Sequence, residues 1–269
     1  MREMRLSTDK VRFPGAIASI SITLGLLLLN LLMPLADTNA GAQPLPFSEG
    51  ERLTYDIYWG FIKVGETVME VLPNSIFQNK PVRHFRIETR TMPLIDLVYK
   101  VRSRIEAYTD LDMNHTVLYK KNHREAGVHR NVVVTFDWKN REAAYLDSGR
   151  QEQTTEIRPG TFDPLGILYF ARTRNFDTVE KFERPVTDGK KCVIGRGELL
   201  KRERIAIRGR HYDTYVIEPD MLGIEGLFEE NQDARFTLWL TSDHSRIPVK
   251  ISIEVFIGTV VCELTLHAG

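Results

Sequence analysis

The stretch RLTYDIYW, residues 52–59, alternates polar and apolar side chains at every position. The same period of two returns near the end of the chain, where Phe236, Leu238 and Leu240 alternate with polar residues, as do Ile251 and Ile253. Successive side chains of a strand point to opposite faces, so this period is typical of antiparallel sheets with one buried and one solvated face. These stretches therefore predict half-buried strands.

Short turn signals separate the alternating stretches. They include Asn79-Lys80-Pro81, Asp147-Ser148-Gly149, Asp188-Gly189 and Arg208-Gly209, which supply a proline or residues that tolerate positive φ. More than a dozen candidate strands follow one another, with no regular alternation of strands and helices. The sequence predicts a mostly all-β fold. We expect a single large curved antiparallel sheet that forms an open or half-closed β-barrel or roll.

One segment departs from the period of two. Asp163 suits the N-cap of a helix and Pro164 suits its first turn. Leu165, Leu168 and Tyr169 then follow at helical spacing. The sequence predicts one short amphipathic helix at about residues 164–174, and a segment this apolar is expected to plug or cover the sheet.

The first 42 residues predict an export signal. Basic residues between 2 and 12 precede an apolar run over 15–36, and small residues ending in Ala40-Gly41-Ala42 follow. This order is typical of a secretory signal peptide. We expect cleavage after Ala42, or alternatively after Ala40, and a single β-rich exported domain over 43–269, located in the periplasm or secreted. A retained membrane anchor is the competing interpretation, because residues 17–35 are close to the about 20 that a span needs.

The charge of the exported part is nearly balanced. Without the first 42 residues the chain holds 32 Lys and Arg against 33 Asp and Glu. A nucleic-acid-binding protein carries a pronounced basic excess, so we expect no nucleic-acid partner. We expect contact with the membrane only through the signal segment, if it is not cleaved.

Groups with intrinsic reactivity are few. Cys192 and Cys262 permit a disulfide in an oxidising compartment, and the alternative is that each packs separately as a small apolar residue. The chain has no Gly-x-Ser-x-Gly motif, and the histidines between 84 and 129 lack the helical spacing of metal ligands. An acidic stretch over 218–233 with apolar tips is a candidate flap or weak calcium loop, or an ordinary connection. We expect no catalysis, no cofactor and no metal.

Residues 80–130 carry a local basic excess, with eleven Lys and Arg against six Asp and Glu. Arg102 and Arg104 lie at strand spacing on one face, while Val101 and Ile105 lie on the other. Such a face can meet the phosphates of lipid or glycolipid head groups, and the alternative is a plain solvated face. The candidate head-group contacts are Arg102, Arg104, Lys120 and Arg124.

Several motifs together resemble one family. They are Ser48-Glu49-Gly50-Glu51-Arg52-Leu53-Thr54-Tyr55, Asp163-Pro164-Leu165, Thr187-Asp188-Gly189-Lys190, Leu238-Trp239-Leu240-Thr241-Ser242-Asp243 and Ile247-Pro248-Val249-Lys250. In these motifs the chain is similar to the uncharacterised exported bacterial family known as domain of unknown function 3108, from about Phe47 to Leu266. The resemblance implies an exported, single β-rich domain without an assigned activity, so it implies no catalytic residues. The two cysteines are not part of the pattern.

Three functions follow from this outline. The first is non-catalytic binding of an apolar or lipid-like envelope ligand inside the curved sheet. The second is a structural or assembly factor of the cell envelope acting through protein contacts, and the third is a hydrolase of envelope polymers. The sequence favours the first, by analogy with other curved sheets. The candidate lining residues are Tyr55, Ile57, Trp59, Phe85, Ile87, Phe236, Leu238 and Ile251.

Overall fold

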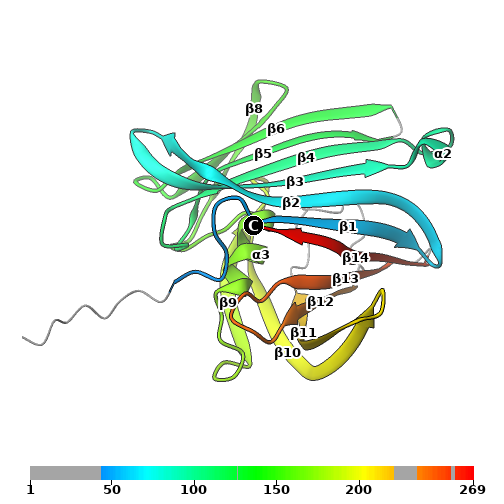
Figure 1. Ribbon diagram of the computed structural model, residues 1–269. Coiled ribbons are helices and arrows are strands. Elements are labelled where there is room, and N and C mark those ends of the chain that lie inside the picture. Colours follow the sequence, from blue (N-terminus) through cyan, green and yellow to red (C-terminus); the bar gives the residue numbers. More distant parts are fainter. Residues whose placement is uncertain (1–43, 126, 221–234, 256–257) are drawn as a thin grey trace, which may run out of the picture. The chain divides into compact units, whose positions relative to one another are not determined.

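The described residues of the chain fold as one antiparallel sheet of fourteen strands, in which most strands consecutive in sequence lie side by side (Figure 1). The computed structural model describes residues 44–125, 127–220, 235–255 and 258–269, and residues 45–269 form one compact unit. The predicted all-β fold is confirmed. The strands are β1 (Arg52–Trp59), β2 (Ile62–Phe77), β3 (Lys80–Thr91), β4 (Val101–Thr109), β5 (Thr116–Glu125), β6 (Val128–Asp137), β7 (Glu142–Asp147), β8 (Arg150–Glu156), β9 (Lys181–Thr187), β10 (Cys192–Ile207), β11 (Arg210–Asp220), β12 (Arg235–Thr241), β13 (Pro248–Val255) and β14 (Gly258–Ala268).

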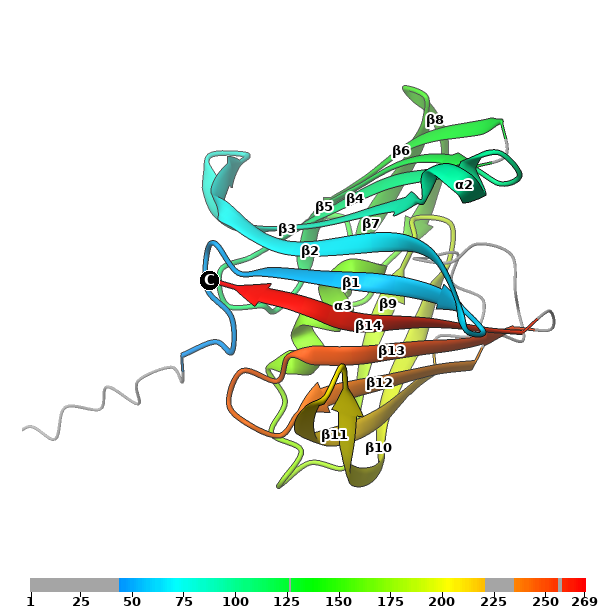
Figure 2. The ribbon, with the colours of Figure 1, turned by 45° about the vertical axis from the view of Figure 1, so that its right-hand side comes forward.

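The strand order shows how the sheet is assembled. It runs β8-β7-β6-β5-β4-β3-β2-β1-β14-β13-β12-β11-β10-β9, so the first and last strands of the chain are neighbours in its middle. Figure 2 shows β1 and β14 side by side, with the two arms of the sheet curling away from them. The edges of the sheet are therefore β8 and β9, which are joined in sequence through residues 157–180, a segment that contains a helix.

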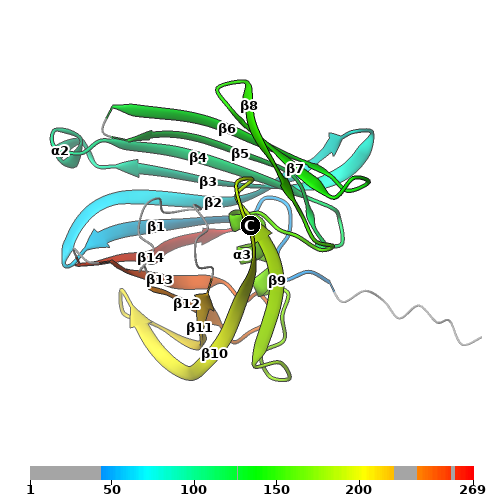
Figure 3. The same ribbon diagram turned by 180° about the vertical axis from the view of Figure 1, so that it is seen from behind.

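The two edges approach each other without completing a ladder, as Figure 3 shows from behind. The Thr155 hydroxyl on β8 donates a hydrogen bond to the Gly189 carbonyl at 2.7 Å, and the Gln153 side chain donates to the Lys190 carbonyl at 2.7 Å. Both acceptors lie in the turn between β9 and β10. The shell is thus half-closed. Side-chain hydrogen bonds join β8 to the turn after β9, and β9 also forms a short parallel backbone bridge with Phe162, in the connection after β8.

Tight turns join the neighbouring strands, as the sequence predicts. In three hairpins both turn residues have positive φ: Gln78 and Asn79, Ser148 and Gly149, and Arg208 and Gly209. Positive φ at both positions is the mark of a type I′ turn, whose twist matches that of the flanking strands. A glycine in the second of these positions removes the steric cost of this conformation.

Two short helices accompany the sheet among the described residues. The predicted helix is α3 (Pro164–Arg172), which ends two residues earlier than expected. Asp163 caps it, because one carboxylate oxygen accepts from the backbone nitrogens of Leu165 at 2.8 Å and Gly166 at 2.9 Å. The second helix, α2 (Pro93–Asp96), is a single turn between β3 and β4 that the alternation did not predict, since it buries no residue. Neither described helix has the length and apolar composition of a membrane span.

Helix α3 fills the concave side of the sheet and completes the core. The Tyr169 ring stacks on Phe85 of β3 with centroids 3.9 Å apart, and Phe47 meets both rings edge-on. The buried Tyr55 hydroxyl of β1 donates a hydrogen bond to the Pro248 carbonyl at 2.7 Å, so this polar group of the core is not left without a partner. Burial of these aromatic rings, each worth about 2–3 kcal/mol of transfer free energy, holds the helix on the sheet.

The cap of α3 is a buried carboxyl whose titration affects stability. Burial raises the pKa of Asp163 to about 6, although the Thr116 hydroxyl at 2.6 Å and the two amides lower it. A folded-state pKa above the unfolded value of 3.8 means that the native protein binds the proton more tightly. Its contribution to stability is therefore fully present below about pH 4 and is lost as the pH rises through about 6.

We expect Asp163→Asn to expose this dependence. Asparagine keeps a cap oxygen for the two amides but carries no charge, so relative to the wild type it should gain about 2–3 kcal/mol between pH 4 and pH 7. The measurement is the free energy of unfolding in urea at both pH values. A difference between variant and wild type that does not change with pH would contradict the raised pKa.

Candidate functional site

A polar groove runs across the face of β2 to β6 that is turned away from α3. Because side chains alternate along each strand, Phe85 and Ile105 point to the core while Arg86 and Arg104 point outward. The groove has a volume of about 1020 Å³. Three cross-strand rows form its floor: Glu66, Arg90, Arg102, Arg124 and His129; Val68, Glu88, Arg104, Asn122 and Asn131; and Glu106, Lys120 and Val133.

The charge of this outer groove is positive. Seven Lys and Arg side chains line it against four Glu, an excess of three positive charges. The basic residues are Arg52, Arg90, Lys100, Arg102, Arg104, Lys120 and Arg124, and the acidic ones are Glu66, Glu88, Glu106 and Glu125. Such a surface attracts anions, and arginine in particular matches the geometry of phosphate and carboxylate oxygens.

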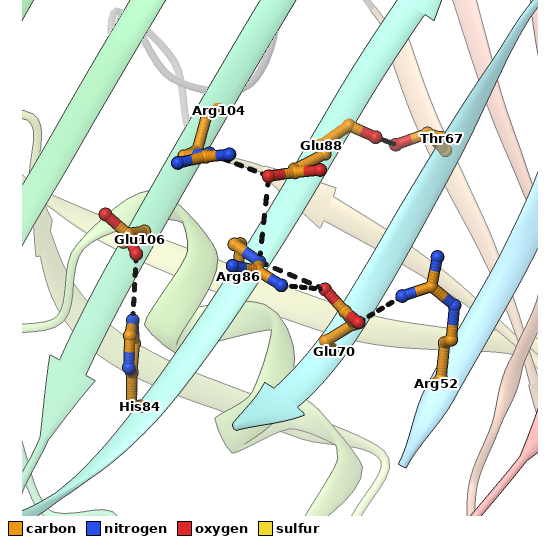
Figure 4. A network of polar contacts seen from close by, with 8 residues as sticks. All are labelled: Arg52, Thr67, Glu70, His84, Arg86, Glu88, Arg104 and Glu106. Carbon is orange, nitrogen blue, oxygen red and sulfur yellow. Dashed lines mark hydrogen bonds and ion pairs between the residues drawn. The ribbon is translucent and has the colours of Figure 1, made fainter. Parts of the chain in front are cut away.

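Cross-strand ion pairs fix the groove floor and the surface beside it (Figure 4). Glu70 accepts from Arg86 at 2.7 and 3.0 Å and also from Arg52 on β1. Burial pushes the pKa of Glu70 upward, but these arginines hold it below its ordinary value. Glu106 pairs with His84 at 3.1 Å, which lowers the pKa of its carboxyl. Both carboxylates therefore stay ionised at neutral pH, in fixed positions.

The structure brings the four predicted head-group residues together in this groove. Two of them are engaged: Arg102 pairs with Asp96 at the end of α2, and Arg104 pairs with Glu88 at 2.7 Å. Lys120 lies 5.3 Å from the Tyr108 ring centroid, and Arg124 is exposed. Among the described residues neither of these last two has a carboxylate within 4.0 Å, so they are available to a ligand. Lys100, directly before β4, likewise has no carboxylate within 4.0 Å among the described residues, and it was not among the predicted head-group contacts.

An apolar rim lies at one end of this part of the sheet, where Val128 also lines the groove. It consists of residues from the β1–β2 hairpin, the α2 segment and the first residue of β6: Trp59, Phe61, Ile62, Leu94, Leu97, Val98 and Val128. Phe61 is 94% exposed and Val98 89% exposed. These segments lie at the same end of the sheet, since Gly65 pairs with Thr91 and Val101 with Glu125 (Figures 1 and 2). An apolar set of this kind beside a charged surface is typical of an interaction site.

The residues predicted to line an interior ligand site lie in or beside the core. Tyr55, Phe85 and Leu238 are buried, and Ile57, Ile87 and Ile251 pack against the core partly buried. Phe236 is also partly buried, whereas Trp59 is half exposed and belongs to the rim. The space in front of Tyr55 and Phe85 is occupied by α3, whose aromatic side chains make the contacts that a ligand would make.

The structure also bears on the two cysteines, the candidate metal ligands and the acidic stretch of the sequence. Cys192 and Cys262 are free thiols on β10 and β14, and both pack in or against the hydrophobic core. Burial raises the pKa of the Cys262 thiol to about 12. No group of three His, Cys, Asp or Glu residues within the described ranges could hold a metal ion. Most of the acidic stretch at 218–233 lies outside the described residues.

Comparisons with known proteins agree with this architecture. No curated protein matches the chain in sequence. Among solved structures, the chain is similar to a β-barrel-like protein of domain of unknown function DUF1849 from Brucella abortus. The TM-score is 0.52 at 11% identity over 81% of this chain and 96% of that chain, which shows the fold alone. The family model described as "Protein of unknown function (DUF3108)" matches residues 54–265, and the chain belongs to that family.

Proposed function

We propose that this protein is an exported, non-enzymatic binding protein for anionic lipid-like envelope ligands. The outer groove is proposed to take the phosphate-bearing head group, and the apolar rim to contact the acyl region beside it. The observation that carries the proposal is the position of the rim at the same end of the sheet as Lys100 and Arg124, two groove residues that form no ion pair with any described residue. The ligand is placed on the outer face because α3 packs against the inner one.

The chemistry of the two surfaces supports this assignment. Each Lys or Arg near an anionic membrane surface contributes about 1 kcal/mol of attraction. A large apolar side chain such as Phe61 adds about 1.5–3 kcal/mol when it leaves water. The groove and rim together therefore suit an amphipathic ligand with a negative head group better than a neutral or wholly apolar one.

Vesicle sedimentation tests the proposal. We expect residues 45–269 to bind vesicles of phosphatidylcholine with phosphatidylglycerol more tightly than pure phosphatidylcholine. The double variant Lys120→Gln/Arg124→Gln should lower the partition coefficient by about 10- to 30-fold, because two attractive charges are lost. Phe61→Ser should lower it by about tenfold or more.

Matched controls are available far from the groove. Arg204→Gln removes an exposed arginine of β10 that pairs with Asp213, and Ile76→Ser removes an exposed apolar side chain near the β2–β3 turn. Both controls should bind like the wild type. Equal binding to neutral and anionic vesicles, or unchanged binding of the groove variant, would contradict the proposal.

The envelope assembly factor is the second candidate, because an exposed apolar rim also fits a protein partner. The same experiment separates the two functions. A protein that binds neither kind of vesicle, while Phe61→Ser abolishes its recovery with an envelope protein, would favour assembly. The positive groove beside the rim makes the lipid-like ligand the better supported candidate.

A further inference from the structure

Two arginines contact Phe170 at the end of the shell opposite the apolar rim, and the charge of a third acts on one of them. Arg174 follows α3, and Arg184 lies on β9. Their guanidinium carbons lie 4.3 and 4.7 Å from the centroid of the Phe170 ring. Arg246, in the turn between β12 and β13, is close enough for its charge to act on Arg174. The arginine cluster, as we name these three residues, thus joins parts of the chain that are distant in sequence.

The arginine cluster has no acidic partner among the described residues. Within the described part of the chain, the Arg174 side chain donates only to the Thr173 hydroxyl, at 2.9 and 3.1 Å. Arg184 donates a single hydrogen bond, to the Glu183 carbonyl at 3.1 Å. Since a guanidinium has five N–H donors, most of the donors of both side chains are left for another acceptor.

Arg246 is similarly unsatisfied. Its Nη1 donates to the His244 carbonyl at 3.1 Å, while its Nε is buried without a hydrogen-bond partner. The pKa of Arg174 is lowered, first by burial and then by the charges of Arg184 and Arg246. Like charges held together in this way oppose each other unless an anion lies between them.

A hollow of about 400 Å³ opens beside this cluster. Arg174, Arg184 and Phe170 form one side of it, and the β4–β5 turn with Pro159 and Gly160 forms the other. One carboxylate, Asp112, also borders the hollow, and its charge acts on Arg83. The volume is within the usual range of small-molecule sites.

We propose that Arg174 and Arg184 bind a small oxyanion of the phosphate class in this hollow, with Arg246 adding positive potential. The planar guanidinium fork pairs with two oxygens of a phosphate group at once, and Phe170 holds the planes of both arginines. Inorganic phosphate and a phosphorylated small molecule share this chemistry. The site is separate from the outer groove and does not depend on the function proposed for it.

Thermal unfolding of residues 45–269 in phosphate tests the site. We expect about 20 mM phosphate to raise the melting temperature by roughly 4–7 °C over chloride at equal ionic strength, as a dissociation constant of about 1 mM implies. Arg174→Gln and Arg184→Gln should each remove most of this rise. Glycerol 3-phosphate in place of phosphate distinguishes the two sources, since a tighter fit raises the melting temperature further at the same concentration.

The matched control is Arg204→Gln, which removes one positive charge from an exposed ion pair elsewhere on the surface. It should keep the full rise in phosphate. Without phosphate, Arg184→Gln should melt no lower than the wild type, because the substitution relieves repulsion. A wild type that does not respond to phosphate would overturn the proposal, as would single variants that respond as strongly as the wild type.

Discussion

Replacing Arg172 with methionine is expected to destabilise the protein by about 3–5 kcal/mol. The side chain of Arg172 is fully buried and forms a two-pronged ion pair with Glu51, at 2.6 and 2.8 Å. It also donates to the carbonyls of Pro46 at 3.2 Å and Ser245 at 3.0 Å. Methionine has a similar volume but no charge, so the buried Glu51 carboxylate would lose its counterion and four hydrogen bonds would be lost.

A second substitution checks this reason. Arg172→Met combined with Glu51→Leu removes both charges, and we expect it to recover most of the lost stability. Arg204→Met, which breaks an exposed pair with Asp213, should cost at most about 1 kcal/mol. Free energies of unfolding in urea measure all three. If Arg172→Met were as stable as the Arg204→Met control, the buried ion pair between Glu51 and Arg172 would not stabilise the fold.

Replacing Phe85 with alanine is expected to cost about 3–5 kcal/mol. Phe85 is 0% exposed and contacts the rings of both Tyr169 and Phe47, so its removal leaves a cavity between β3 and α3. The cost has two parts, the lost burial of the ring and the unfilled space. Denaturant unfolding measures the loss, and an unchanged slope with denaturant would show that the folded state remains compact.

Phe61→Ala is the matched control, since the same atoms are removed from a side chain that is 94% exposed. We expect a change within about 0.5 kcal/mol. If Phe85→Ala were as mild as this control, the interior would be loosely filled and the inner ligand site would regain support. The comparison therefore tests the packing that moves the proposed ligand to the outer face.

The fold could be predicted from local sequence patterns, because strand alternation and turn conformation depend on residues that are close in sequence. Residues 52–59 form β1 as expected, and Ser148-Gly149 forms the predicted turn. Asp163-Pro164 also marks the start of α3 correctly. The α2 turn escaped prediction because four residues, none of them buried, carry no periodic signal.

Long-range contacts were beyond such patterns. Glu51 and Arg172 are 121 positions apart, and nothing in the sequence near either residue indicates the other. The cluster of Arg174, Arg184 and Arg246 depends on the packing of α3 against two distant parts of the sheet. By contrast, the outer groove was partly predictable, since Arg102 and Arg124 face each other across a simple hairpin. The signal for the groove was the recurrence of charged or polar side chains at every second position of β3, β4 and β5, which places them on one face of the sheet.

The central position of β14 sets an order for assembly. Each arm of the sheet grows by hairpins between consecutive strands, and such contacts form early because they close short loops. The pairing of β1 with β14 instead joins residues such as Arg52 and Ala268, from opposite ends of the domain. During synthesis from the amino end, β1 and β13 therefore each have one unpaired edge until β14, which pairs with both, has been made.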